Sequence, residues 1–308
     1  MRRILVIGGS AFVGLAVVRA FLRDGCKVAV LNRGHRSVKG VEQISADRND
    51  IGEVLTAIGS RTFDAVVDTN CYLPQQAKIL CEALRGQATN LLMISSAAVY
   101  ADDAAQPPSE NQPLGGARAW GDYGRDKFQA ERVFLESTFA HVSILRPPYI
   151  FGPGNNLDRE RWFWSRLLAG KPIILPRDGN TAVQFVHEDD VGIAVCLLVD
   201  QNQRERAIFN IADLEILTLS GLTTMLAEVA GVRDLQIKLG EKFSNVPARK
   251  WFPFRDYPCL AEPSRLYAKG WTPHSNLRAR FAETFRTLRD QIQAPALSSF
   301  EQEIYASF

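Results

Sequence analysis

The stretch that most constrains the fold runs from Arg2 to Gly14, where the apolar run Ile4–Ile7 stops at two glycines and a helix-forming run begins near Phe12. A strand, a glycine turn and a helix in this order can bind a dinucleotide pyrophosphate. Glycine lets the backbone approach phosphate without a Cβ, and the helix N-terminus offers free N–H groups and a partial positive charge. The contacts expected from this turn are Gly8, Ser10, Ala11, Phe12, Val13 and Gly14.

The glycine pattern by itself also fits an ordinary strand–turn–helix without a ligand, because Ala11 stands where a third glycine could lie. The start of the chain, Met1-Arg2-Arg3 before an apolar run, imitates a secretory signal peptide. Two adjacent glycines interrupt that run, however, and Arg19 enters its second half. We therefore expect a cytoplasmic protein.

The composition narrows the class of protein. The 308 residues carry a net charge of +2 and are 46% hydrophobic, enough for a core in one large or two modest domains. A charge so close to zero gives no reason to expect nucleic acid or an acidic membrane as a partner, and the apolar run Val191–Val199 is too short to span a bilayer. Five scattered cysteines and four separated histidines form no disulfide or metal pattern. We expect a reducing compartment, no metal and a small-molecule substrate.

Short apolar runs alternate with helical patterns along the first half of the chain. Such runs predict parallel strands covered by helices on both faces, which is the doubly wound α/β sheet of the Rossmann type. The expected strands are Ile4–Ile7, Lys27–Leu31, a strand end at Ile44–Asp50, Phe63–Asn70, Asn90–Ser96 and His141–Arg146, and the helices after the first are Ile51–Ile58, Pro74–Arg85 and Tyr123–Ser137. Ligands of such sheets bind beyond the carboxyl ends of the strands.

Prolines and glycines at 147–154 interrupt this alternation. We expect residues 1–150 to form the dinucleotide-binding domain and residues 151–308 to form mainly a smaller C-terminal α/β substrate domain, with some segments returning to the first. The elements expected there are helix Arg159–Ala169, a strand pair at Ile173–Leu175 and Ala182–His187, helix Val191–Val199 capped by Asp189 or Asp190, strand Ala207–Ile211, and helices Ser220–Ala230 and Leu277–Ile292. The tail Ser298–Phe308 is either a docking helix or frayed.

The second strand ends in Asn32-Arg33, about 20 residues after the glycine turn, where this fold meets the adenosine ribose. A carboxylate there would bind the 2′-hydroxyl of NAD, whereas a guanidinium binds the 2′-phosphate of NADP. NADP is therefore favoured over NAD, although Arg33 and Arg36 could also be solvated loop charges. The other cofactor contacts expected from their positions are Asp47 (near the adenine amino group), Arg48, Thr69, Asn70, Ser95, Tyr123, Lys127 and Pro147.

The pattern Tyr123-x-x-x-Lys127 places a phenol and an ammonium one helical turn apart, and Ser96 ends a strand upstream. A free phenol titrates near pH ~10, but a lysine and an oxidised nicotinamide beside it would favour the phenolate. Tyr123 could then take the proton of a substrate hydroxyl while Ser96 holds the same oxygen and Lys127 binds the nicotinamide ribose. We expect these three residues to be catalytic in hydride transfer.

Candidate substrate contacts lie past residue 150, at Asn155, Arg161, His187 and Tyr257. Arg161 shares a helix with several aromatic residues, which would suit a nucleotide diphosphate, although such a face is more commonly core. His187 is either an acid–base group or a hydrogen-bonded structural residue. Tyr257 lies in the irregular segment Val246–Pro263, which either closes over the substrate or lies on the surface.

Taken together, these motifs resemble the extended short-chain dehydrogenase/reductases, the NAD-dependent epimerase/dehydratase family, closely to about Val199 and more loosely beyond. The resemblance is carried by Gly8-x-x-x-x-x-Gly14, Ile94-Ser95-Ser96-Ala97-Ala98-Val99-Tyr100, Tyr123-x-x-x-Lys127, Arg146-Pro147-x-x-Ile150-x-Gly152-Pro153-Gly154 and Gln184-Phe185-Val186-His187-x-Asp189-Asp190. It implies that Ser96 takes the catalytic Ser/Thr place, Tyr123 the base and Lys127 its partner. It also implies a nucleotide-sugar substrate and a homodimer.

The chain departs from the family pattern in places. Ala11 replaces the middle glycine, and Ala97-Ala98 replaces the acid pair of sugar 4,6-dehydratases, so dehydration is not expected. The segments around the glycine turn and Asn32-Arg33 also resemble an atypical branch, some of whose members bind RNA or sense redox state and several of which have lost the Tyr/Lys pair. This chain keeps the pair. That favours an NAD(P)-dependent epimerase or reductase over an NADP-binding regulatory or RNA-associated protein, or a cofactor binder without turnover.

Overall fold

The computed structural model of the chain describes residues 1–200 and 206–308. Its largest layer is a seven-stranded parallel sheet in the order β10-β6-β5-β4-β1-β2-β3. These strands are β1 (Arg3–Ile7), β2 (Lys27–Asn32), β3 (Glu42–Ser45), β4 (Phe63–Asp68), β5 (Ala88–Ile94), β6 (His141–Arg146) and β10 (Arg206–Asn210). The strand order reverses between β1 and β4, which confirms the doubly wound sheet predicted from the unalternating apolar runs.

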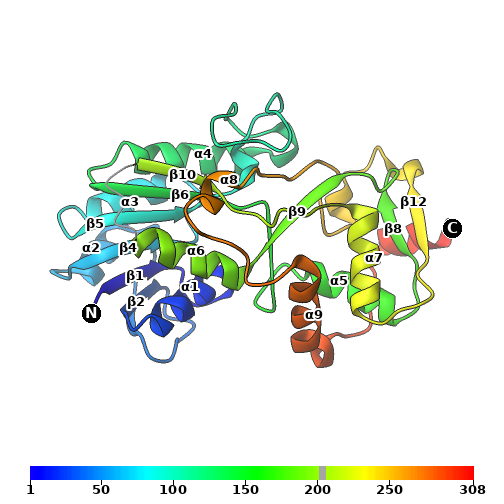
Figure 1. Cartoon of the computed structure of the whole chain (residues 1–308), viewed down its shortest axis with the longest axis horizontal. Helices are drawn as coiled ribbons and strands as arrows, with labels where there is room; N and C mark the ends of the chain where they lie inside the picture. The colour runs from blue at the N-terminus through cyan, green and yellow to red at the C-terminus, as the bar shows by residue number, and fades with distance from the viewer. Residues whose placement is uncertain (201–205) are drawn as a thin grey trace.

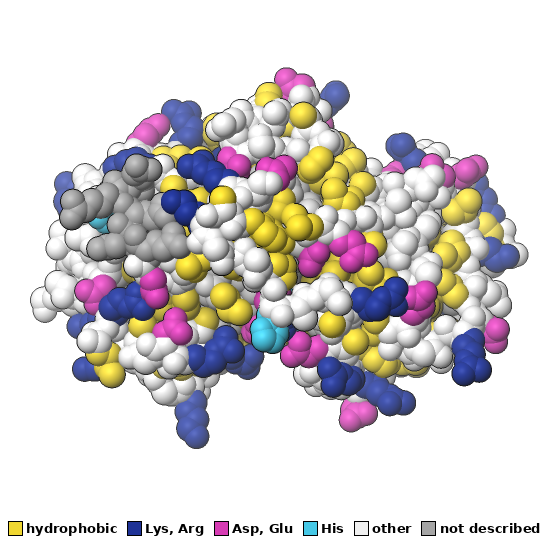
Figure 2. Space-filling model, in the orientation of Figure 1, with side chains coloured by type: hydrophobic (Ala, Val, Ile, Leu, Met, Phe, Trp, Pro, Cys, Tyr) yellow, Lys and Arg dark blue, Asp and Glu magenta, His cyan; other side chains and the backbone are white. Residues whose placement is uncertain are grey.

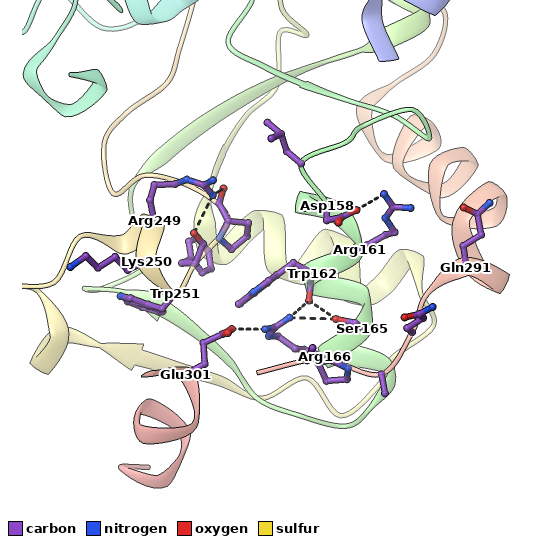
Figure 3. A pocket seen from close by; sticks show the side chains of 17 residues that line it. Asp158, Arg161, Trp162, Ser165, Arg166, Arg249, Lys250, Trp251, Gln291 and Glu301 are labelled. Atoms are coloured by element: carbon purple, nitrogen blue, oxygen red, sulfur yellow. Dashed lines mark hydrogen bonds and ion pairs between the residues drawn. The ribbon is translucent and has the colours of Figure 1, made fainter. Parts of the chain in front are cut away.

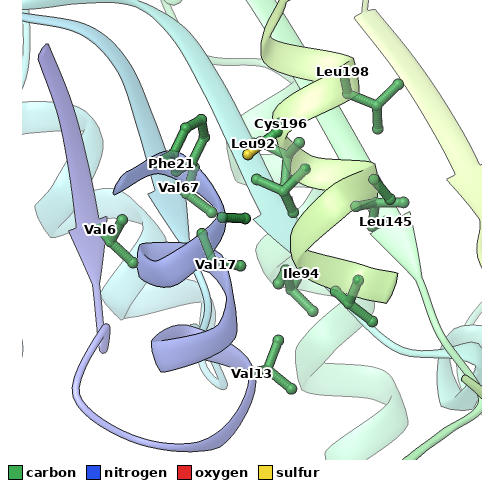
Figure 4. Close-up of a cluster of buried hydrophobic side chains, with 14 of the residues drawn as sticks. Val6, Val13, Val17, Phe21, Val67, Leu92, Ile94, Leu145, Cys196 and Leu198 are labelled. Carbon is green, nitrogen blue, oxygen red and sulfur yellow. The ribbon is translucent and has the colours of Figure 1, made fainter. Parts of the chain in front are cut away.

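Helices cover both faces of this sheet (Figure 1). One face carries α1 (Phe12–Arg23) and α6 (Glu188–Asp200), and the other carries α2 (Ile51–Ile58), α3 (Pro74–Ala83) and α4 (Asp122–Leu135). On the first face, Val17 and Phe21 of α1 lie against sheet residues such as Val6 and Val67 (Figure 4). Because apolar side chains leave both faces of the strands, the sheet is buried between two helical layers.

The chain beyond residue 151 contributes to both halves of the molecule. Its α6 and β10 join the large sheet, and α8 (Ser264–Tyr267) packs beside β10. The remaining elements form a smaller lobe at the right of Figure 1: β7 (Tyr149–Phe151), α5 (Arg159–Leu168), β8 (Ile173–Pro176), β9 (Ala182–His187), β11 (Ile216–Thr218), α7 (Leu219–Val229), β12 (Ile237–Gly240), α9 (Leu277–Leu288) and α10 (Ser299–Ala306). The assignment of a cofactor domain to residues 1–150 stays a prediction.

The expected strand pair in the small lobe is wrong. The strand β8 pairs with β12, and β9 lies between β7 and β11. The three short partner strands give no clear sequence pattern, because each has only three or four residues. Because these three strands were not predicted, β8 and β9 could only be paired with each other.

Helix caps were predicted with mixed success. Asp50 caps α2 as expected, since its carboxylate accepts from the Glu53 N–H at 3.0 Å. At α6 the prediction is wrong: His187 Nδ1 accepts from the Asp189 N–H at 3.2 Å, while Asp190 binds the Arg280 guanidinium. The buried Arg280 needs a carboxylate partner, which explains why Asp190 points away from the helix N-terminus.

The C-terminal tail ends in a helix that docks on the small lobe. The Tyr305 hydroxyl of α10 donates to the Pro172 carbonyl at 2.9 Å, and Glu301 pairs with the buried Arg166 of α5 at 2.5 Å. Acidic and basic side chains are interspersed over the face of the molecule shown in Figure 2. Within the described residues, no helix combines the length and the apolar character that a membrane span requires.

Candidate functional site

A cavity of about 940 Å³ lies at the carboxyl ends of the large sheet. All the residues predicted to be catalytic or to bind the cofactor line it: Gly8, Ser10, Ala11, Phe12, Val13, Gly14, Asn32, Arg33, Asp47, Arg48, Thr69, Asn70, Ser95, Ser96, Tyr123, Lys127 and Pro147. These residues come from the ends of six parallel strands and from the start of α4. The fold therefore gathers into one hollow what the sequence spreads over 140 positions.

The glycine turn lets a ligand approach the main chain closely, and it has no room for side chains on the glycines themselves. Gly8 has a φ of +82°, and a Cβ there would meet Asn70 Cγ at 2.7 Å; a Cβ on Gly14 would meet the Gly8 carbonyl at 2.2 Å. The first turn of α1 has no side-chain cap and no acidic residue, so its N–H groups are left for an anion. The Ser95 hydroxyl, buried in the same lining, has no hydrogen-bond partner among the described residues. These residues fit a dinucleotide.

The adenosine end of the cavity is shaped by two polar side chains that hold their own loops. Asn32 accepts from the Gly34 N–H at 2.8 Å and donates to the Arg36 carbonyl at 3.2 Å. The Asp47 carboxylate accepts from the Asn49 main-chain N–H at 2.9 Å, and this bond lowers the pKa of Asp47. Arg33 is exposed and makes no hydrogen bond or ion pair within the part of the chain that the structure describes.

Arg48 is held in a buried network rather than left free for a ligand. Its guanidinium makes two bonds to the Asp68 carboxylate, at 2.8 and 2.7 Å, and a third to Asn70 Oδ1 at 2.5 Å. Thr69 is also engaged, because its hydroxyl donates to the Ile7 carbonyl at 2.8 Å. The network holds the end of β4 against the glycine turn, because Asn70 belongs to the network and its side chain packs directly against Gly8.

The catalytic candidates meet at the inner end of the cavity. Lys127 is buried, and its Nζ donates to the carbonyls of Cys71 and Ile94, both at 2.8 Å. Burial lowers the pKa of Lys127 to about 8. Ser96 starts a short turn in which its Oγ accepts from the Ala98 N–H at 3.1 Å. Two of the three lysine N–H groups are thus used, and one is left to face the cavity.

The environment of Tyr123 without a ligand favours the protonated phenol, and the phenolate expected beside an oxidised nicotinamide stays a prediction. Desolvation by the surrounding protein raises the pKa of this phenol to about 12, and a hydrogen bond with Ser96 lowers it only in part. Its ring lies 6.4 Å, between centroids, from the rings of both Tyr72 and Trp120. Because desolvation outweighs the nearby positive charge, Tyr123 keeps its proton at neutral pH in the protein without a ligand.

The four predicted substrate contacts are not among the residues that line this cavity, and their role stays a prediction. Asn155 is buried and donates through Nδ2 to the Glu160 carboxylate at 3.0 and 3.1 Å. Arg161 pairs with Asp158 and faces a different cavity. His187 caps α6, and burial lowers its pKa, which suits a neutral acceptor. The Tyr257 hydroxyl donates to Asp102 at 3.3 Å, which ties two loops together.

Three arginines, Arg159, Arg249 and Arg255, also line the cavity. Arg159 lies over the Tyr149 ring at 4.9 Å, and Arg255 lies over the Trp120 ring at 5.0 Å. Arg249 donates to the main-chain carbonyls of residues 252 and 253. Burial and then the charges of Arg159 and Arg255 lower the pKa of Arg249, so the three cations repel one another. None of them pairs with a carboxylate within the described residues.

The sequence could have indicated only part of this cluster. Arg159 lies on a helix already considered for substrate binding, whereas Arg249 and Arg255 lie in the irregular segment Val246–Pro263, which has no periodic pattern. A basic–aromatic run at 249–251 was the only available signal. Fixing which arginines meet requires the tertiary path of the chain from α5 to the irregular segment.

The fold and this cavity define a Rossmann-type dinucleotide-binding protein with a smaller lobe over the site. The model of the NAD dependent epimerase/dehydratase family matches residues 4–212, which is more than half of the chain. The protein belongs to the NAD-dependent epimerase/dehydratase family, whose members include epimerases, dehydratases and reductases of nucleotide sugars.

Relatives with different names share this family. The chain is 27% identical over 294 residues to the chloroplast stem-loop binding protein of 41 kDa b of Arabidopsis thaliana, covering 90% of this chain and 76% of that one. It is also 27% identical over 216 residues to 2'-dehydrokanamycin reductase of Streptomyces kanamyceticus, covering 67% and 60%. In structure it is similar to a UDP-glucose 4-epimerase of Thermotoga maritima, with a TM-score of 0.78, 18% identity and coverage of 94% and 100%. At that identity the likeness establishes the fold alone.

Proposed function

We propose that this protein transfers hydride between bound NADP and an oxygen-bearing carbon of an anionic sugar, such as a nucleotide sugar. The observation that carries the proposal is the single cavity that holds the glycine cradle, Ser96, Tyr123 and Lys127 together. The cofactor, when bound, supplies or accepts the hydride. The same residues serve a net reduction or an epimerisation, because both require a proton to move at the same substrate oxygen.

Each catalytic residue has a role that follows from its environment. Tyr123, protonated at neutral pH, can donate its proton to a carbonyl oxygen in the direction of reduction, and as the phenolate it can take a proton from a hydroxyl in the direction of oxidation. Ser96 hydrogen-bonds the same oxygen and keeps it in line. Lys127 offers its third N–H to a ribose hydroxyl. Epimerisation would also need Tyr123 to accept a proton, and positive charge nearby would have to lower its pKa first.

A direct test is the absorbance of the reduced cofactor at about 340 nm. Protein loaded with NADPH should lose this absorbance with a keto sugar nucleotide, or protein loaded with NADP⁺ should gain it with a hydroxylated one. UDP-glucose and GDP-mannose are suitable first substrates because both carry a diphosphate for the arginines. Failure with every sugar nucleotide, in both directions, would count against the proposal.

The cofactor preference is tested at Arg33. The Arg33→Ala variant should bind NADP about tenfold more weakly and NAD less than twofold more weakly, because the lost guanidinium contacts only the 2′-phosphate. Arg23→Ala, an exposed change at the far end of α1, is the matched control and should alter neither affinity. Fluorescence titration of both cofactors measures the effect, and an equal loss for NAD and NADP would refute the phosphate contact.

The substrate charge is tested at the arginine cluster. Inorganic pyrophosphate should bind to NADP-saturated protein, and Arg255→Gln should weaken that binding about tenfold because one of three charged contacts is lost. Arg233→Gln, an exposed change in the small lobe, serves as the control. Calorimetry would contradict the proposal if pyrophosphate does not bind, or binds equally to wild-type and Arg255→Gln protein.

An RNA-associated role is the second candidate, favoured by the identity to the stem-loop binding protein. The retained Tyr123 and Lys127 and the interspersed surface charges of Figure 2 count against it. Binding of a stem-loop RNA at physiological salt, without turnover of any sugar nucleotide, would favour this candidate instead.

We further propose a cytoplasmic homodimer, which sedimentation and cell fractionation can test.

A further inference from the structure

A second cavity, of about 590 Å³, lies in the small lobe and contains none of the catalytic candidates (Figure 3). Its walls are the outer face of α5, the irregular segment at residues 249–253 and the C-terminal tail at residues 291–301. This volume falls in the range of small-molecule sites. Nothing in the proposed hydride transfer uses it.

The helix α5 divides its side chains between this cavity and the core. Phe163, Trp164 and Leu167 are buried in the small-lobe core, while Trp162, Ser165 and Arg166 face the cavity. The opposite wall is held in place by the pair between Arg166 and Glu301, which Figure 3 shows near the centre of the cavity. The ion pair therefore ties the C-terminal tail to α5 across the cavity.

The lining has more positive than negative charge. Its two acids are already paired, Asp158 with Arg161 and Glu301 with Arg166. The Arg249 side chain binds only main-chain carbonyls, and the Lys250 side chain makes no hydrogen bond or ion pair within the described residues. Two cations thus face the cavity without a compensating carboxylate. A bound anion would offset this excess of positive charge and gain charge-assisted hydrogen bonds.

The lining also offers flat aromatic surface. The rings of Trp162 and Trp251 belong to it, and the Arg166 guanidinium lies 3.9 Å from the Trp162 ring centroid. Stacked indole and guanidinium groups suit a planar ring, because both present large flat faces with little side-chain entropy to lose. The indole Nε1 of Trp251 and the Nε of Arg166 are buried without an acceptor, so the wall is short of acceptors as well as of negative charge.

We propose that this cavity is a second ligand site, which binds an anion that carries a planar ring, as a nucleoside monophosphate does. Leu157, Arg249 and Pro253 line both cavities, so the two sites share a wall. The anion is either the distal part of a long substrate that enters through the first cavity or a separate molecule. The same chemistry recognises both.

The test uses uridine 5′-monophosphate as the probe and calorimetry on NADP-saturated Arg255→Gln protein, in which the arginine cluster of the first cavity is weakened. Adding Lys250→Glu should weaken binding about tenfold, because an attractive charge becomes repulsive. Lys78→Glu, an exposed change on α3, is the matched control and should alter the affinity less than twofold. No binding by the parent, or equal binding after Lys250→Glu, would overturn the proposal.

The ring is tested separately. Inorganic phosphate should bind the parent at least tenfold more weakly than uridine 5′-monophosphate, and Trp162→Ala should remove most of that difference. An unchanged difference in Trp162→Ala would show that the ring lies elsewhere and would overturn the assignment. Competition then identifies the source: UDP-glucose that displaces the probe indicates the distal part of a substrate, and simultaneous binding indicates a separate ligand. None of these readouts needs turnover, so they stand whether or not hydride transfer is observed.

Discussion

Tyr123→Phe is expected to reduce the rate of hydride transfer about a thousandfold, because a positioned general acid or base contributes a factor of this order. The substitution removes one hydroxyl and leaves the ring between Tyr72 and Trp120 in place. Cofactor affinity should therefore change less than twofold. Single-turnover absorbance of NADPH-loaded protein with a keto sugar nucleotide measures the rate of the chemical step apart from product release.

Two controls separate loss of the proton donor from general damage. Tyr257→Phe also removes a phenol, but this one binds Asp102 outside the cavity, and the rate should stay within about twofold of wild type. The pH profile gives a second check. Wild-type reduction should stay level through neutral pH, because the pKa of the Tyr123 phenol lies well above 7 and the proton is present there. A fully active Tyr123→Phe enzyme would remove the central role proposed for this residue.

Glu160→Gln is expected to stabilise the fold by about 3 kcal/mol at pH 8 and to leave it unchanged near pH 4.5. Burial raises the pKa of this carboxyl from 4.5 to about 7, so the folded state holds a proton more tightly than the unfolded state. In the wild type, the contribution of the protonated Glu160 to the free energy of unfolding is fully present below pH 4.5 and is lost as the pH rises through about 7. A neutral glutamine does not incur this loss, and its amide oxygen can still accept from Asn155.

Urea unfolding at pH 5 and pH 8 measures this difference. The matched control is Glu241→Gln, an exposed change that should alter stability by less than about 0.5 kcal/mol at either pH. Glu160→Gln also removes a negative charge that raises the pKa of the buried Glu188. Part of the gain in stability therefore comes from easier ionisation of Glu188. An equal stability change at both pH values would mean that the ionisation of Glu160 is not the cause.

The strand–turn–helix at the N-terminus shows how far local sequence can determine structure. Its apolar run, its glycines and the start of α1 at Phe12 all lie where the pattern placed them. The reason is physical: a buried parallel strand needs an unbroken apolar run, and a turn against phosphate needs a residue without a Cβ. The same reasoning placed Ser96, Tyr123 and Lys127 in one cavity, because the ends of parallel strands share one edge of the sheet.

The substrate side shows where that reasoning stops. Asn155 and His187 are polar residues next to a predicted site, yet the fold uses one to hold a buried carboxylate and the other to cap a helix. Sequence patterns do not distinguish a polar residue that serves the fold from one that serves a ligand, because both uses need the same donors and acceptors. Arg249 shows the converse, since a basic–aromatic run at 249–251 was the only sign of it in an irregular segment.

The sequence by itself determined the doubly wound sheet, the glycine turn and the grouping of Ser96, Tyr123 and Lys127 in one cavity, because each depends on local patterns and on the shared edge of a parallel sheet. Only the tertiary structure decided the protonation of Tyr123, the pairing of β8 and β9, and the meeting of Arg159, Arg249 and Arg255. These depend on desolvation and on contacts between segments far apart in the chain, which no local spacing encodes.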